Sequence, residues 1–396
     1  MFALFARARK ALRPVAMFAT AALLAACDVS TMTDLGSAGS GGPSIDPGQT
    51  VRVALLVPQS DPSAAAVARD LENAARLAIA DLGNAQIDLA VYDTAGQPAQ
   101  AAAQAQRAVD EGARIILGPL RGEEAVEASK VVADEGVNVL AFSNNASIAG
   151  GNLFILGPTF NNTADRLMGF GTRRGIKTVA VLYSQDVPGE FGRTAISQAA
   201  ARNGVSVVAE QPYELSVEGV TRTAQSMGNI VGSSGAQSVF ITSDATNAAM
   251  PLLLQLMPEN GVNPAVTQYI GLTRWDVAPQ LFSYPGAQGA WFTMPDQAMQ
   301  RNFNARYRGS YGAEPHPLAG LAFDGVAAIG ALVAQGRSDA LTGRALTQAA
   351  GFQGTGGVFR LKSDGTNERG LAVATIQNNQ VTILDPAPSS FSGAGF

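Results

Sequence analysis

Seven polar side chains stand shortly after apolar runs of the sequence, where they could together bind a small polar ligand. These candidate cleft residues are Ser60, Arg121, Ser143, Asn144, Asp186, Asp244 and Thr273. They offer hydroxyl, amide, carboxylate and guanidinium groups, which hydrogen-bond or form ion pairs with a ligand. Each also has an ordinary structural explanation, because Ser, Asp and Asn cap helices and Gly-Pro pairs form turns. The ligand-binding interpretation therefore depends on whether the fold brings the seven residues together.

The elements that would position these residues are short buried strands that alternate with helices. Residues 51–57 are almost continuously apolar and end at Pro58, which is typical of a parallel strand buried on both faces. Further strand-like runs lie at 87–93, 114–118, 137–142, 178–183, 205–208, 238–242 and 268–271. Apolar residues at helical spacing separate them, so the sequence predicts parallel sheets covered by helices, in two lobes. Loops after parallel strands converge on one edge, where helix N-termini present free N–H groups.

The last part of the chain departs from this alternation. Helices are expected over 317–334 and 341–350, followed by strands at 357–361 and 371–377. Asn378-Asn379 between apolar residues suits a two-residue hairpin, whose central residues need positive φ. Antiparallel strands at the end of a two-lobed α/β chain often join an earlier sheet, so we expect the chain to cross between the lobes several times.

Cys27 is the only cysteine of the chain and ends the sequence Leu24-Ala25-Ala26-Cys27. Four basic residues precede an apolar run over 15–24, which is too short to span a bilayer and suits a secretory signal peptide. A cysteine at the cleavage point resembles the lipobox of bacterial lipoproteins. The resemblance implies that Cys27 is lipidated and anchors the protein to the inner or outer membrane of a Gram-negative bacterium. The alternative is a buried core cysteine.

The charge and the histidine content argue against several classes of function. Removal of the four basic residues in 1–26 leaves 23 basic and 32 acidic residues, a net charge of −9. No run of Lys or Arg remains, so we expect no nucleic-acid partner. His316 is the only histidine, which leaves no imidazole pair for a metal site and no confident Ser-His-Asp arrangement. We therefore expect no enzyme activity, no metal and no cofactor.

Four segments, in a characteristic order and spacing, resemble those of a known family. They are Val53-Ala54-Leu55-Leu56-Val57-Pro58, Tyr92-Asp93-Thr94-Ala95-Gly96, Ile116-Leu117-Gly118-Pro119-Leu120 and Gly289-Ala290-Trp291-Phe292. The region from residue 51 to about 385 resembles the type 1 periplasmic binding proteins, the leucine-binding-protein superfamily. This implies a Venus-flytrap fold of two doubly wound parallel-sheet α/β lobes joined by three crossovers, near 157–158, 293–295 and 354–357. Ligands in such folds bind between the lobes at the carboxyl ends of the strands.

The resemblance and the element pattern together predict the domain division. It consists of a signal peptide at 1–26, a flexible linker at 27–50 after lipidated Cys27, a first lobe of 51–157 plus 294–353, a second lobe of 158–293 plus 354–386, and a disordered tail at 387–396. The linker is rich in Ser and Gly and lacks hydrophobic periodicity, so it cannot bury enough apolar surface to pack.

The candidate cleft departs from the amino-acid binders of the superfamily. Those proteins hold the ligand carboxylate with hydroxyl residues after the Gly-Pro turn, whereas Arg121 stands there in this chain. Glu123 and Glu124 follow it and would repel a carboxylate. On the second lobe, the family usually has an acid that pairs with the ligand's amino group and an aromatic lid. The positions of the acid fall at Asp244 and Thr273, and the position of the lid falls at Pro188. An amino-acid transport role is weakened by these departures, although it remains open.

A second branch of the same superfamily accommodates these departures. Lipoproteins that activate penicillin-binding proteins carry such a domain without needing a small ligand, and segments 92–95, 118–120 and 139–144 resemble that branch. The resemblance implies a non-catalytic periplasmic lipoprotein that docks on a penicillin-binding protein and regulates peptidoglycan synthesis. The alternative is an ABC-transporter substrate-binding protein that delivers an amino acid or another small polar solute to an ABC permease.

Overall fold

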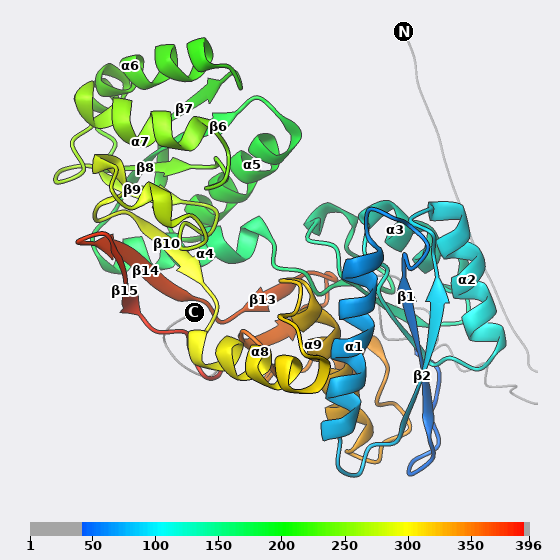
Figure 1. The fold of residues 1–396 in the computed structure, drawn as a ribbon. Helices are drawn as coiled ribbons and strands as arrows, with labels where there is room; N and C mark the ends of the chain where they lie inside the picture. Colours follow the sequence, from blue (N-terminus) through cyan, green and yellow to red (C-terminus); the bar gives the residue numbers. More distant parts are fainter. Residues whose placement is uncertain (1–41, 392–396) are drawn as a thin grey trace, which may run out of the picture. The chain divides into compact units, whose positions relative to one another are not determined.

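The computed structural model describes residues 42–391, an α/β fold with two main sheets covered by helices (Figure 1). Cys27, the predicted signal peptide and most of the predicted linker lie outside these residues. Within 42–391, no helix combines the length and the apolar character that a membrane crossing requires.

The first lobe is built on a five-stranded parallel sheet with strand order β2-β1-β3-β4-β5. Its strands are β1 Val51–Val57, β2 Ile87–Asp93, β3 Ile115–Leu117, β4 Asn138–Ala141 and β5 Leu153–Ile155. Successive side chains of a strand point to opposite faces. Val53 and Leu55 accordingly join one hydrophobic core, whereas Ala54 and Leu56 join the core on the other face. The apolar run at 51–57 thus forms a strand buried on both sides, as predicted.

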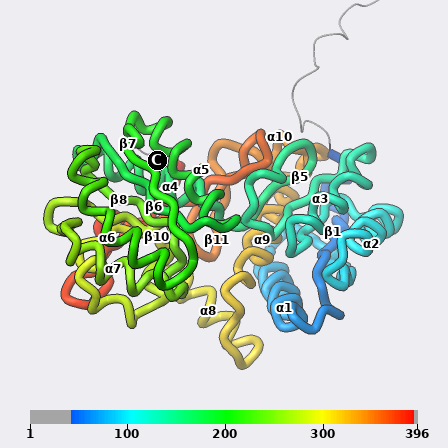
Figure 2. The backbone as a smooth tube through the Cα atoms, turned by 90° about the horizontal axis from the view of Figure 1, so that it is seen from above, coloured from blue at the N-terminus to red at the C-terminus, as the bar shows by residue number. Residues whose placement is uncertain are grey.

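Helices from two distant parts of the sequence cover this sheet. They are α1 Ala65–Asp81, α2 Pro98–Asp110, α3 Gly122–Val131, α8 Gln297–Tyr311, α9 Ala319–Val333 and α10 Gly343–Leu346. α9 packs against α1 (Figures 1 and 2). Leu71 of α1 and Ile329 of α9 lie in the same core as Val53. One face of the first sheet is therefore closed by a helix that comes late in the chain.

The second lobe is built on a seven-stranded sheet with strand order β15-β14-β10-β9-β8-β6-β7. Its strands are β6 Thr178–Ser184, β7 Ser206–Tyr213, β8 Ser238–Ile241, β9 Gln268–Gly271, β10 Trp291–Met294, β14 Ala372–Gln377 and β15 Gln380–Asp385. β6 to β10 are parallel, whereas β14 and β15 add to one edge in antiparallel pairs. The predicted hairpin is confirmed, because Asn378 and Asn379 between β14 and β15 have φ values of 52° and 59°.

Two pairs of helices cover the two faces of this second sheet. α4 Phe160–Arg173 and α5 Val187–Arg202 share one core with Val179 and Val181 of β6. α6 Val217–Ser234 and α7 Ala249–Glu259 share the other core with Ala180 and Leu182. Single-turn 3₁₀ helices lie in connecting segments, at η1 Ala146–Ile148, η2 Pro279–Leu281 and η3 Pro285–Ala287.

A small antiparallel sheet lies between the first-lobe helices and β14 in the chain. Its strands are β11 Phe352–Gly354, β12 Gly357–Leu361 and β13 Asn367–Arg369. The chain passes from one lobe to the other after β5, after β10 and after β13. We expected the last passage near 354–357, but Phe352 and Phe359 pack together, with ring centroids 5.6 Å apart, in the core of the first lobe. The strands that carry them therefore belong with the first core.

Candidate ligand-binding site

The structure places four of the candidate residues after the carboxyl ends of first-lobe strands. Ser60 follows β1, Arg121 stands between β3 and α3, and Ser143 and Asn144 follow β4. Arg121, Ser143 and Asn144 line one pocket of about 740 Å³, which we call the strand-end pocket. Ser60 does not line it. β3 and β4 are neighbours in the sheet, which is why the loops that follow them meet at this pocket.

Arg121 is held by groups of its own lobe. Its guanidinium donates to Asp61 Oδ2 at 2.5 Å and to the carbonyl oxygen of Gly96 at 3.0 Å. Hydrogen bonds from Ser63, and then from Arg121, hold the pKa of the Asp61 carboxyl below its ordinary value. Asp61 is therefore a carboxylate at neutral pH and balances the charge of Arg121.

Glu124 adds a second carboxyl beside Arg121. Its side chain is buried, and its Oε2 accepts a hydrogen bond from Thr94 Oγ1 at 2.7 Å. Its Oε1 lies 3.8 Å from the Arg121 guanidinium and has no hydrogen-bond partner among the described residues. Burial raises the pKa of this carboxyl. Glu123 is exposed in the same first turn of α3, so the positive end of this helix dipole already carries two acidic side chains.

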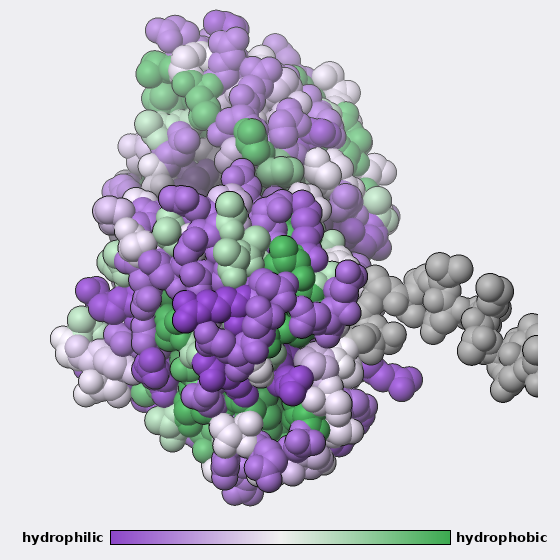
Figure 3. Space-filling model, turned by 90° about the vertical axis from the view of Figure 1, so that its right-hand side faces the viewer, coloured by the Kyte–Doolittle hydropathy of each residue, from purple (hydrophilic) through white to green (hydrophobic). Residues whose placement is uncertain are grey.

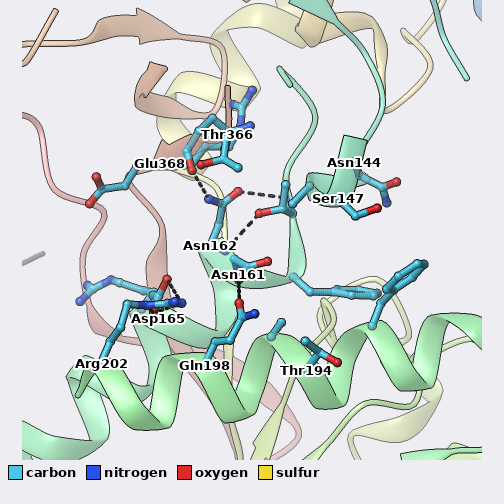
Figure 4. Close-up of a pocket in the computed structure, with 18 of the residues that line it drawn as sticks. Asn144, Ser147, Asn161, Asn162, Asp165, Thr194, Gln198, Arg202, Thr366 and Glu368 are labelled. Atoms are coloured by element: carbon cyan, nitrogen blue, oxygen red, sulfur yellow. Dashed lines mark hydrogen bonds and ion pairs between the residues drawn. The ribbon is translucent and has the colours of Figure 1, made fainter. Parts of the chain in front are cut away.

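A second pocket, of about 810 Å³, lies along α4 and α5 (Figure 4). We call it the helix-face pocket. Its walls come from α4, from α5, from the loop 144–147 after β4 and from residues 362–369 around β13. Asn144 lines both pockets. Of its lining residues, the sequence indicated only Asn144, as a candidate cleft residue, and Pro188, at the lid position of the family.

The candidate residues of the second lobe stabilise local structure and line neither pocket. Asp186 caps α5 by accepting a hydrogen bond from the Gly189 N–H at 2.9 Å. Asp244 accepts from the N–H two residues later at 2.8 Å. Thr273 Oγ1 donates to the carbonyl oxygen of Ser243 at 3.2 Å. The structure thus brings together three first-lobe candidates, while these three follow the ends of β6, β8 and β9 in separate turns.

Every charged side chain that lines the helix-face pocket is paired with another side chain of the protein. Arg202 donates two hydrogen bonds to Asp165, at 2.9 and 2.8 Å (Figure 4). The other pairs are Arg166–Asp385, Arg173–Asp385, Lys362–Asp364, Arg360–Glu368 and Arg369–Asp324, with N···O distances from 2.6 to 3.6 Å. Each of these charged groups therefore has an oppositely charged partner within the protein, although Asp385 serves two arginines and one net positive charge remains.

Amide groups in the same pocket retain free hydrogen-bonding atoms. Asn161 Nδ2 donates to Gln198 Oε1 at 3.1 Å, which joins α4 to α5 (Figure 4). Within residues 42–391, three groups have no hydrogen-bond partner: Asn161 Oδ1, Gln198 Nε2 and the side-chain amide of Asn144. Ser147 Oγ donates to Asn145 Oδ1 at 2.7 Å and can still accept a hydrogen bond.

One end of the helix-face pocket is apolar. Val187 and Phe191 line it and are 68% and 47% exposed. The side of the molecule that Figure 3 shows is mostly hydrophilic, with hydrophobic residues in small separate areas. Positions 187, 191, 194, 198 and 202 of α5 repeat at helical spacing along the pocket. Val187 and Phe191, the two apolar residues among these five positions, are the signal in the sequence that indicates this pocket.

A metal site finds no support in this part of the chain. Among residues 42–391, no group of three His, Cys, Asp or Glu side chains is arranged to hold a metal ion. His316 forms a turn before α9, where its Nδ1 accepts a hydrogen bond from the Leu318 N–H at 3.2 Å.

Known proteins share this fold and most of its length. A family model described as periplasmic binding protein matches residues 50–380. The chain is similar to a putative branched-chain amino acid ABC transporter protein of Rhodospirillum rubrum, with 18% identity, a TM-score of 0.71, and coverage of 85% of this chain and 100% of that one. It is also similar to an ABC transporter substrate-binding protein of Desulfitobacterium hafniense in complex with Leu, with 17% identity, a TM-score of 0.59, and coverage of 85% and 100%.

A third solved structure is a solute-binding protein of Rhodopseudomonas palustris BisB5 in complex with 3,4-dihydroxybenzoic acid. It has 18% identity, a TM-score of 0.54, and coverage of 86% of this chain and 98% of that one. A search of curated protein sequences found no match. At these identities the likeness concerns the fold.

Proposed function

The chain belongs to the periplasmic binding protein family, and we propose that it is a non-catalytic lipoprotein that activates a penicillin-binding protein in peptidoglycan synthesis. Membership implies a periplasmic location, and the similar solved structures are of substrate- and solute-binding proteins. The proposed role as an activator rests on the arrangement of the strand-end pocket in this chain.

The observation that carries the proposal is that Arg121 is already paired with acidic side chains of its own lobe. In this chain its guanidinium is bound by Asp61 at 2.5 Å and lies 3.8 Å from Glu124. A ligand carboxylate that approached Arg121 would meet these two acids and Glu123. Like charges about 5 Å apart repel by about 3 kcal/mol at an effective dielectric constant of about 20. The strand-end pocket is thus poorly suited to the carboxylate of an amino acid.

A two-lobed binding protein that does not bind an amino acid can instead dock on another protein. Segments 92–95, 118–120 and 139–144 resemble the lipoproteins that activate penicillin-binding proteins. In this structure segments 92–95 and 139–144 contain the ends of β2 and β4 with the residues that follow, and segment 118–120 directly follows β3. Lipidation at Cys27 would hold the protein at a membrane, where such synthases work, because acyl chains contribute about 0.8 kcal/mol per buried CH₂.

The proposal is tested with the purified full-length chain and a purified bifunctional penicillin-binding protein in a glycan-polymerisation assay. We expect the chain to raise the initial rate at least twofold and to co-purify with the synthase. Cys27→Ser should keep this effect in solution but move the protein from the membrane fraction to the periplasmic fraction of cells. Unchanged rates together with no co-purification would contradict the activator role.

A second candidate, a solute receptor for an ABC permease, is favoured by the two pockets of about 810 and 740 Å³. A ligand that binds the folded state raises the melting temperature by mass action. A thermal-shift screen with amino acids and other small polar solutes therefore tests this role. If the strand-end pocket holds the ligand, Ser143→Ala and Asn144→Ala should abolish the shift. A shift that both variants retain would refute that assignment.

A further inference from the structure

We propose that the helix-face pocket binds an uncharged ligand rich in hydroxyl and amide groups, with the chemistry of an N-acetylated sugar chain. This pocket differs from the strand-end pocket and shares Asn144 and Asn145 with it. The inference rests on the proposed function only for the source of the sugar, which would be the glycan strands that a peptidoglycan synthase makes.

The first argument is that the charged side chains of the pocket are already paired. Arg166 and Arg369 have side chains only 6% and 10% exposed, and each is paired with an aspartate. Asp165 and Arg202 occupy each other through two hydrogen bonds. A charged ligand would have to compete with such a pair and leave a partly buried partner unpaired, which is costly. An uncharged ligand leaves all the pairs in place.

The second argument is the supply of free hydrogen-bonding groups. Asn161 Oδ1 can accept, Gln198 Nε2 can donate, and the Asn144 amide can do both. Asn144 comes from the first-lobe loop, whereas Asn161 and Gln198 come from α4 and α5 (Figure 4). A sugar hydroxyl also both donates and accepts, and an N-acetyl group presents one N–H and one carbonyl. The walls of the pocket thus offer the complementary groups.

The third argument is the apolar end and the size of the pocket. Val187 and Phe191 stand one turn apart on α5, and both are well exposed. The C–H face of a sugar ring or the methyl of an N-acetyl group would cover them and remove apolar surface from water. The volume of about 810 Å³ lies in the upper part of the range of roughly 300–1,000 Å³ for ligand pockets. An oligosaccharide fills such a space better than a single amino acid does.

The test is calorimetric titration of the full-length chain with tetra-N-acetylchitotetraose, in a detergent without a sugar headgroup. We expect saturable binding that Gln198→Ala and Val187→Ser each weaken at least fivefold. Gln255→Ala on α7, across the second sheet from α5, is the control for the amide. Val266→Ser is the control for the apolar residue, because Val266 is 79% exposed in the loop before β9. Both controls should bind like the wild type.

Salt supplies an independent readout. Because the charges of the pocket are already paired, raising the salt concentration tenfold should change the affinity less than twofold. Absence of binding, equal binding by the pocket and control variants, or a steep salt dependence would each overturn the proposal. The synthase assay does not contain this probe, so failure of sugar binding and failure of the activator role are observed separately.

Discussion

Replacement of Arg369 by methionine would break a buried ion pair at the last passage of the chain between the lobes. Arg369 on β13 lies 3.2 Å from Asp324 on α9, and their side chains are 10% and 1% exposed. Arg369 also donates to the carbonyl oxygen of Leu156, just after β5. Asp324 accepts a further hydrogen bond from the Thr355 N–H at 2.6 Å. The pair therefore joins four separate segments of the chain.

The expected cost follows from burial and distance. At 3.2 Å, opposite charges attract by about 5 kcal/mol if the effective dielectric constant is about 20. Removal of one partner of a buried pair leaves the other uncompensated and costs about 3–5 kcal/mol. For the 350 residues from 42 to 391, an unfolding entropy of about 2.1 cal/mol/K per residue converts this cost to a fall in Tm of about 4–7 °C. Methionine keeps much of the apolar stem of arginine, so most of the loss reports the charge.

The assay is differential scanning calorimetry of the wild type, Arg369→Met, and the double variant with Asp324→Asn. The double variant should recover part of the loss, because it buries no unpaired charge. Arg337→Met is the matched control, since Arg337 and Asp339 form a pair whose side chains are 56% and 46% exposed. Such a pair contributes about 0–1 kcal/mol. If Arg369→Met and Arg337→Met lowered Tm equally, burial would not be what gives the Arg369 pair its strength.

Further predictions concern a carboxyl, two glycines and a helix cap. Burial raises the pKa of Glu124 above its ordinary 4.5, so its contribution to stability is complete below 4.5 and is lost as pH rises through the folded-state value. Glu124→Gln should therefore flatten the fall in unfolding free energy that denaturant titrations measure as the pH rises above 4.5. Gly228→Ala should destabilise α6, because its Cβ would lie 1.9 Å from the carbonyl oxygen of Asn260. Gly232→Ala in the same helix meets nothing within 4 Å and should stabilise by about 0.5–1 kcal/mol. Asp186→Ala should cost about 1 kcal/mol by removing the cap of α5, whereas Asp186→Asn should keep it; equal losses would refute the capping role.

The fold was predictable where a local pattern decides the structure. The apolar run at 51–57 is long enough to specify a strand buried on both faces, and Asn378-Asn379 specifies a hairpin because both residues tolerate positive φ. The last passage between the lobes was not predictable in this way. Its position depends on Phe352 and Phe359 packing into a core formed mostly by residues far earlier in the chain.

The candidate sites were predictable in part for the same reason. Parallel strands place Arg121, Ser143 and Asn144 at one edge. The sequence cannot show that Arg121 binds Asp61, because these residues are 60 positions apart and their pairing is set by the fold. The helix-face pocket is lined by four separate segments of the chain, so no single sequence motif predicts it.

The packing of α9 against α1 bears on how this chain can fold during export. Val53 and Leu55 of the first strand share a core with Ile329 of α9, which follows β6 to β10 of the second lobe in the chain. Until α9 has been delivered, one face of the first sheet lacks its cover and exposes a band of Val and Leu to other chains. The first lobe therefore cannot mature ahead of the second as an independent unit. Residues 51–157, expressed alone, should aggregate or remain unfolded, and chaperone protection should be needed until the last third of the chain arrives.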